Sequence, residues 1–243
     1  MRFESLHAAN SAGAYAGGMT TGDDALQPVM RQLAGRFVVF EGADGSGKST
    51  QFKRLADVAE SMALPHVLVR EPGGTVTGEA IRHVLLDKAN TGMSVRCEML
   101  LYMASRAELV ASVMMPALRA RKLVLADRFV SSTLAYQGTA GGLSTADISA
   151  VARVATGGLM PDLVLLFDLP QEAASKRLSP KLDRMESKGA AFHQLVRKGY
   201  LEQAKSDPGR YAVIDASQPQ EAVWQQVCRV LAERVARLPA LLS

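Results

Sequence analysis

The sequence is poor in cysteine and has no long apolar stretch. Cys97 and Cys228 are its two cysteines, and they show neither CxxC spacing nor a companion histidine cluster. This usage argues against a disulfide framework or a zinc site, and it fits a reducing, cytoplasmic setting. No run approaches the roughly 18 apolar residues of a membrane-spanning helix, so we expect no membrane span.

The composition is that of an enzyme-sized globular unit with a small excess of positive charge. Hydrophobic residues make up 48% of the 243 residues and charged residues 21%, which allows a large core and favours one α/β domain. Lysine and arginine total 28 against 24 acids, so the formal charge is +4 and the pI is about 9.2. This balance suits an anionic partner, whether a nucleic acid or a nucleotide.

The first 33 residues differ from the rest of the chain. They are rich in Ala, Gly, Ser and Thr, and the pairs at 17–18 and 23–24 break any periodicity. We therefore expect a flexible extension over residues 1–33, followed by one folded domain over 34–243. The extension lacks the apolar core of a secretion signal. An organellar targeting peptide remains an alternative, although Glu4, Asp23 and Asp24 weaken it.

Five short apolar runs predict β-strands separated by longer segments. The runs cover residues 37–40, 66–70, 123–127, 163–168 and 211–215, and segments 48–62, 95–118 and 221–237 have the pattern of helices. Strands alternating with helices indicate a parallel sheet covered on both faces. Ligands of such sheets bind beyond the carboxyl ends of the strands. Those ends carry Glu41, Arg70, Asp127, Asp168 and Asp215.

A phosphate-binding loop follows the first predicted strand. Residues 42–49 satisfy the pattern GxxxxGK[ST] between a predicted strand and a predicted helix, which is the context that supports the motif. Backbone N–H groups and the helix N-terminus converge on phosphate there. Lys48 is expected to reach the β- and γ-phosphates, and Ser49 to ligate Mg²⁺. A loop that binds nucleotide without turnover remains an alternative. The ATP-binding candidates here are Gly42, Ala43, Asp44, Gly45, Ser46, Gly47, Lys48, Ser49 and Thr50.

Two further strand ends carry arginine. Asp127 and Arg128 end the third apolar run, where a carboxylate commonly organises the hydrated Mg²⁺ and an arginine faces the transferred phosphoryl group or its acceptor. Arg70 precedes the rigid turn Glu-Pro-Gly-Gly-Thr, which suits a bidentate phosphate contact. Taken alone, each feature also fits an ordinary strand end with a surface arginine.

In combination these motifs resemble the thymidylate kinase family. The resemblance rests on residues 40–50, 70–75, 127–129 and 135–138, and it runs in the family's order from about Arg36 to Arg237. It implies a P-loop kinase fold of the α/β class, with a five-stranded parallel sheet, helices on both faces and a short lid. It further implies phosphorylation of dTMP to dTDP with ATP and Mg²⁺ for dTTP synthesis, usually by a homodimer.

The resemblance also implies roles for individual residues. Tyr102 matches an aromatic that stacks on thymine, and Arg106, one helical turn later, matches an arginine that meets a base carbonyl. Tyr136 matches a residue near the sugar that helps exclude a ribose 2′-hydroxyl. The remaining implied contacts are Thr133 and Gln137 at the base edge, Asp44 at the deoxyribose 3′-hydroxyl, and Arg70 and Arg128 at the dTMP phosphate.

The segment from about 176 to 190 resembles the mobile lid that closes over ATP and excludes water. In this family the catalytic arginine stands either in the P-loop or in the lid, and the loop position here is Gly45. The lid is shorter and poorer in arginine than lids of that type. Arg177 matches a position that stacks on adenine, so Arg184 or Lys181 is expected to supply the charge; a solvated basic loop is the alternative.

The acceptor phosphate is already ionised, so alignment and charge neutralisation suffice for catalysis. The four histidines, at positions 7, 66, 83 and 193, lie outside the motifs.

Another small-molecule P-loop kinase is the nearest alternative, and it would make the Tyr102, Arg106 and Gln137 set a coincidence. A nucleic-acid or regulatory nucleotide-binding protein would need a clustered basic face. Because basic residues are spread along the chain or gathered at strand ends, we expect no nucleic-acid partner.

Overall fold

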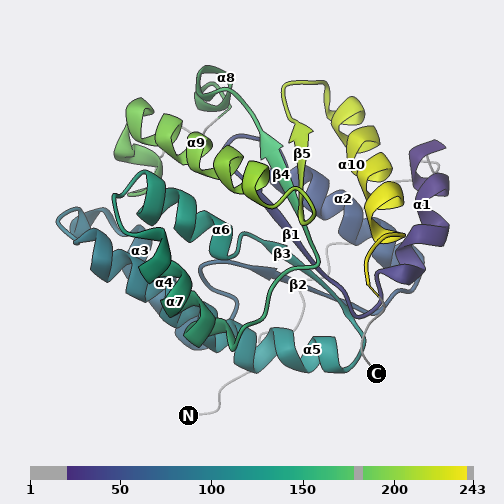
Figure 1. Ribbon diagram of the computed structural model, residues 1–243, viewed down its shortest axis with the longest axis horizontal. Coiled ribbons are helices and arrows are strands. Elements are labelled where there is room, and N and C mark those ends of the chain that lie inside the picture. The colour runs from purple at the N-terminus through teal and green to yellow at the C-terminus, as the bar shows by residue number, and fades with distance from the viewer. Residues whose placement is uncertain (1–20, 178–182, 240–243) are drawn as a thin grey trace, which may run out of the picture.

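The computed structural model describes residues 21–177 and 183–239, with five parallel strands in the order β2-β3-β1-β4-β5 (Figure 1). The predicted parallel α/β fold is confirmed, and a strand lies at each of the five predicted runs. β1 is central because it pairs with β3 on one side and β4 on the other. The strands are β1 (Phe37–Gly42), β2 (His66–Arg70), β3 (Leu123–Asp127), β4 (Leu163–Asp168) and β5 (Tyr211–Asp215).

Helices cover both faces of the sheet (Figure 1). The predicted helix over 95–118 is divided into α4, a π-helical turn and α5. The α-helices are α1 (Thr21–Gln32), α2 (Lys48–Ser61), α3 (Val76–Leu86), α4 (Val95–Leu109), α5 (Met115–Arg119), α6 (Val130–Thr133), α7 (Thr145–Thr156), α8 (Gln171–Ser175), α9 (Ala190–Ser206) and α10 (Gln220–Val235). The shorter turns are η1 (Lys88–Asn90), η2 (Val110–Met114), η3 (Leu134–Thr139) and η4 (Glu186–Lys188).

Strand alternation separates two apolar layers. Val38 and Phe40 of β1 point into the core shared with α1, α2 and α10, whereas Phe37 and Val39 point into the core shared with α4, η2 and α5. All four side chains are buried, so β1 is apolar on both sides, as expected for a central parallel strand. The carboxyl end of β1 is thereby held firmly where the P-loop begins.

The expectation of a flexible extension up to residue 33 does not hold for residues 21–33. Residues 21–32 form α1, which packs against α10 (Figure 1). Leu26, Val29, Met30 and Leu33 recur at helical spacing, and all four are buried in the core beneath α10. Burial of this apolar stripe outweighs the poor helix propensity of the flanking residues. Residues 1–20 lie outside the described part of the chain.

Leu26→Ala is expected to lower the free energy of unfolding by about 2–5 kcal/mol, because Leu26 is fully buried and truncation leaves a cavity. Urea denaturation followed by circular dichroism measures the change. Gln27→Ala is the matched control: Gln27 is exposed on the same helix, so its cost should stay below about 0.5 kcal/mol. Equal, small effects of the two substitutions would contradict a structural role for α1.

No helix in the described residues is both long and apolar enough to cross a membrane.

Candidate active site

The P-loop joins the end of β1 to the start of α2. Gly45 and Gly47 have φ values of 80° and 81°, in the left-handed region that glycine adopts without strain. A Cβ on Gly45 would lie 2.5 Å from the backbone oxygen of Ala174, so a side chain at this position would require the backbone to shift. One cavity is lined by Ala43, Asp44, Gly45, Ser46, Gly47, Lys48, Ser49, Thr50 and Arg177. The structure therefore brings the predicted ATP-binding residues together, with Gly42 at the strand end behind them.

Lys48 lies at the N-terminus of α2, and its Nζ is 2.6 Å from Oδ1 of Asp127. The pairing of β1 with β3 brings the two residues close, because it sets Phe40 opposite Asp127. The Lys48 side chain is buried, whereas that of Asp127 is 22% exposed. This places a cation and a carboxylate together at the mouth of the P-loop.

A second cavity lies beyond the carboxyl ends of β2 and β3. It is lined by the predicted residues Arg70, Tyr102, Asp127, Arg128, Thr133, Tyr136 and Gln137, and it shares Asp44, Lys48 and Ser49 with the P-loop cavity. The two cavities therefore meet at these three residues. A phosphate held by the P-loop and an anion in the second cavity would face each other across this junction.

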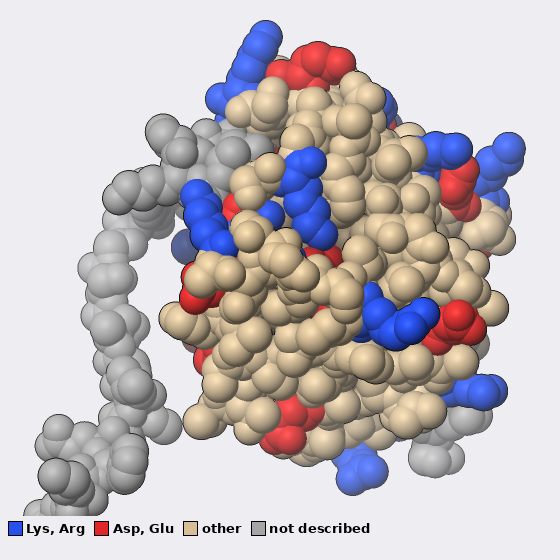
Figure 2. Space-filling view, turned by 90° about the vertical axis from the view of Figure 1, so that its left-hand side faces the viewer, with Lys and Arg blue, Asp and Glu red and all other residues tan. Residues whose placement is uncertain are grey.

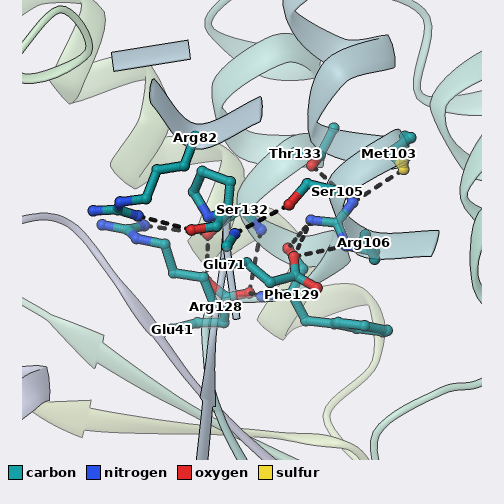
Figure 3. A network of polar contacts seen from close by, with 12 residues as sticks. Glu41, Glu71, Arg82, Met103, Ser105, Arg106, Arg128, Phe129, Ser132 and Thr133 are labelled. Atoms are coloured by element: carbon teal, nitrogen blue, oxygen red, sulfur yellow. Dashed lines mark hydrogen bonds and ion pairs between the residues drawn. The ribbon is translucent and has the colours of Figure 1, made fainter. Parts of the chain in front are cut away.

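Arg128 is held rigidly in the second cavity. Its backbone has a φ of 75°, unusual for a residue other than glycine. Its Nη2 donates to Oδ1 of Asp44 at 2.5 Å, and its Nη1 donates to Ser132 and Tyr200. Arg128 is followed directly by the backbone N–H of Phe129, which donates to the buried carboxylate of Glu41 at 2.8 Å (Figure 3). The guanidinium is thus fixed in direction before any anion arrives.

Two tyrosines form the wall of this cavity. Burial raises the pKa of Tyr102 and of Tyr136 well above the ordinary range, so both phenols stay neutral. The Tyr136 hydroxyl donates to Oδ2 of Asp44 at 3.3 Å, and the Arg128 guanidinium lies 5.4 Å from the Tyr136 ring centre. The cavity thus combines flat neutral rings with cations, which is suited to a nucleotide that carries a base and a phosphate.

The profile of the family described as Thymidylate kinase matches residues 40–227 of this chain. The chain belongs to the thymidylate kinase family. A thymidylate kinase of Symbiobacterium thermophilum is 46% identical over 202 residues, covering 83% of this chain and 94% of the relative. One from Desulforudis audaxviator is 47% identical over 208 residues with the same coverages. The crystal structure of thymidylate kinase from Ehrlichia chaffeensis has a TM-score of 0.67 and 31% identity, covering 82% of this chain and 98% of that one.

Arg106 is the predicted base-contact residue that the structure does not bring to the cavity surface. Its side chain is 1% exposed and does not line the cavity in the described structure. Its Nε donates to the Glu71 carboxylate at 2.8 Å, and its two other nitrogens donate to Met103, Thr133 and Phe129 (Figure 3). Burial raises the pKa of Glu71 to about 7, while Arg106 acts in the opposite direction. Arg106 therefore stands behind the cavity wall and touches it through Thr133.

Arg82 is a cavity residue that the sequence motifs missed. It lies on α3, lines the second cavity beside Arg70, and donates from Nη1 to the Pro72 carbonyl at 2.9 Å. Figure 3 shows the Arg82 and Arg128 side chains extending toward the same side of the polar network. Burial, together with the positive charge of Arg70, lowers the pKa of Arg82. No spacing rule relates Arg82 to the strand-end motifs, so its place emerges only from the fold.

The structure describes two parts of the segment predicted to form the lid, one before residue 178 and one after residue 182. Arg177 lines the P-loop cavity and donates to the Ala216 carbonyl at 3.3 Å. Lys181 lies outside the described residues. Arg184, the other predicted catalytic cation of this segment, does not line either cavity in the described structure. It is 4% exposed, donates to the Leu85 carbonyl at 2.6 Å and pairs with Glu98 at 2.6 Å.

Proposed function

We propose that this chain transfers the γ-phosphate of ATP to dTMP, giving dTDP for dTTP synthesis. The observation that carries the proposal is the meeting of the P-loop cavity and the second cavity at Asp44, Lys48 and Ser49. A donor in the first cavity and a monophosphate in the second would have their reacting phosphates at this junction. Membership of the thymidylate kinase family supports dTMP as the acceptor.

Cations at the junction carry the chemistry of the proposal. Lys48 neutralises charge on the β- and γ-phosphates, while Arg128 and Arg70 hold the acceptor phosphate. Because a phosphate oxygen of dTMP is already ionised, no general base is needed, and catalysis consists of alignment and charge stabilisation. Arg70 lies on the exposed side of the cavity, where it also forms an ion pair with Glu79 at 2.9 Å. Arg177 is proposed to stack on adenine, and Lys181 is proposed as the lid cation at the transferred phosphoryl group.

Mg²⁺ is proposed as the accompanying ion. The described residues contain no group of three or more acidic, histidine or cysteine side chains that would hold a metal alone. This fits Mg²⁺, which binds through one or two protein oxygens together with water and nucleotide phosphates. Ser49 and Asp127 would supply those oxygens beside the P-loop, and the bound ion would neutralise phosphate charge. The donor set, a hydroxyl and a carboxylate, suits a hard cation.

The nucleoside of dTMP is proposed to lie along the wall of the second cavity. Tyr102 provides a stacking surface for thymine, and Thr133 and Gln137 face the base edge. Asp44 and Tyr136 meet the sugar, where Tyr136 leaves no room for a 2′-hydroxyl. We also propose a homodimer, on the basis of the family resemblance, and a cytoplasmic location, on the basis of the cysteine usage.

A nucleic-acid-binding protein is the alternative of another class. On the face drawn in Figure 2, lysine and arginine are interspersed with acids and neutral residues and do not form one basic patch. Four cations, by contrast, line the second cavity together: Lys48, Arg70, Arg82 and Arg128. This distribution favours a small anionic substrate over a nucleic-acid backbone.

The proposal predicts a kcat/KM for dTMP that exceeds those for dCMP and UMP by at least about tenfold. Cytosine presents an amino group where thymine has an oxygen, and a ribose hydroxyl would crowd Tyr136. Coupled detection of ADP release with a panel of purine and pyrimidine monophosphates measures the preference. Equal values across the pyrimidines would contradict the proposed base and sugar contacts, and activity with purines alone would assign another monophosphate kinase.

A further inference from the structure

Gln137 is bound to a buried carboxylate behind the cavity wall. Its Nε2 donates to Oε1 of Glu98 at 2.8 Å, and both residues are 1% exposed. A carboxylate only accepts hydrogen bonds, so the reversed amide would place two oxygens against each other. The Gln137 carboxamide is therefore held in one orientation. Its Oε1 receives no hydrogen bond from the described residues, although Gln137 lines the cavity.

The Glu98 carboxylate is kept ionised by its surroundings. Arg184 Nη1 lies 2.6 Å from Oε2, and Lys188 Nζ lies 3.1 Å from each carboxylate oxygen. Glu98 also stands in the first turn of α4, where the helix N-terminus favours negative charge. Burial alone would raise the pKa of Glu98, but the Gln137 hydrogen bond and the two cations outweigh it and lower that pKa. Glu98 thus remains an acceptor near neutral pH.

A second wall residue is held in a complementary way. Arg106 Nη1 donates to Oγ1 of Thr133 at 3.2 Å, which leaves the hydroxyl hydrogen of Thr133 able to point into the cavity. Two buried charges of opposite sign therefore bias two neighbouring wall groups. Gln137 is left with an acceptor for the cavity, and Thr133 with a donor.

An acceptor on Gln137 and a donor on Thr133 match the base edge of thymine and do not match that of cytosine. Thymine carries a hydrogen-bond donor at N3 and an acceptor at O4, whereas cytosine carries an acceptor at N3 and a donor at N4. We propose that Glu98 is a positioning residue that fixes the Gln137 carboxamide so that Oε1 accepts from N3–H, and thereby excludes cytosine. The inference deepens the proposed function and rests on it, since it concerns the acceptor base of the same cavity.

The test compares dTMP with 5-methyl-dCMP, which differs from dTMP only at the N3 and C4 positions of the base. The wild-type ratio of kcat/KM for the two substrates is expected to be at least about 10². Glu98→Gln presents an amide that can donate or accept, so Gln137 gains both orientations and the ratio should fall about tenfold or more. Because the ratio is taken within one preparation, loss of part of the folded enzyme cancels.

Two further variants separate positioning from stability. Lys188→Met removes another partner of Glu98 but leaves the Gln137 hydrogen bond, so its ratio should stay within about twofold of the wild-type value. Glu98→Asp keeps the buried negative charge but shortens the side chain, which draws the carboxylate away from Gln137. In Glu98→Asp the ratio of kcat/KM for dTMP to that for 5-methyl-dCMP should fall several-fold. This variant serves as the test if Glu98→Gln does not fold.

An unchanged ratio in a folded Glu98 variant that still phosphorylates dTMP would overturn the inference and leave the proposed function intact. A wild-type enzyme that accepts both nucleotides equally would also overturn it. If the wild type phosphorylates neither dTMP nor 5-methyl-dCMP in the presence of ATP and Mg²⁺, the proposed function itself fails. A ratio that falls equally in Lys188→Met and Glu98→Gln would assign the effect to general loosening of the wall.

Discussion

Lys48→Met is expected to lower kcat by about 10³-fold or more while the protein remains folded. Lys48 stands where the two cavities meet, and in the proposed reaction its ammonium would meet the β- and γ-phosphates. The negative charge of the transferred phosphoryl group must be neutralised there as the bond to ADP breaks. Methionine fills a similar volume without charge, so the loss should appear in kcat and leave packing largely unchanged.

The free energy of unfolding of Lys48→Met should differ little from that of the wild type, because Asp127, the ion-pair partner of Lys48, is partly exposed to solvent. Asp127 has a side chain that is 22% exposed, so water can solvate it once the ammonium is gone. Lys53→Met is the matched control on the same helix: Lys53 is exposed and pairs with Asp57 at 2.9 Å away from both cavities. Steady-state ADP release measures the turnover of both variants, and thermal unfolding measures their stability. Turnover of Lys48→Met within about tenfold of wild type would remove Lys48 from the chemistry.

The sheet and the P-loop could be predicted because their signals are local. Each strand is a short apolar run ending in a polar residue, and β2, β3, β4 and β5 have the predicted bounds. The loop is equally local, since Gly42 and Gly47, the two glycines that the motif fixes, both have positive φ values of 143° and 81°. Predictions succeeded where one short segment determines its own conformation.

Helix α1 was missed although its signal was present in the sequence. Leu26, Val29, Met30 and Leu33 recur at the spacing of one helix face, but glycine and aspartate pairs on the N-terminal side obscured the pattern. The decisive contribution comes from α10, about 200 residues later in the chain, which covers this stripe. A helix stabilised mainly by a distant partner cannot be read from its own propensity.

The wall of the acceptor cavity shows a second limit of sequence reasoning. Tyr102 and Arg106 do lie one helical turn apart, yet Tyr102 lines the cavity and Arg106 stands behind it. The difference arises from Glu71, which approaches from the end of β2 and binds Arg106 in a buried ion pair at 2.5 Å. Helical spacing indicates which side chains share a face, but it does not indicate which of them a neighbouring element will bind.

Arg184→Ala is expected to destabilise the protein by about 3–5 kcal/mol, because it breaks a buried ion pair and leaves Glu98 with less compensation. Arg184 donates to the Leu85 carbonyl at the end of α3 and to Glu98 on α4, so it attaches the segment before α9 to two helices. Urea unfolding would measure the loss. Arg184→Lys should recover part of it, since an ammonium keeps the charge but not the two-sided contact.

Activity measurements on Arg184→Ala separate a structural role of Arg184 from a catalytic one. Normalised to the folded fraction, kcat of Arg184→Ala should fall by less than about tenfold, since the guanidinium does not line either cavity in the described structure. A double-mutant cycle with Glu98→Gln should show strong coupling in unfolding free energy, because the two side chains are direct partners. The opposite pattern, wild-type stability with kcat reduced 10²–10³-fold, would return Arg184 to the transferred phosphoryl group and require the lid to carry it there on closure.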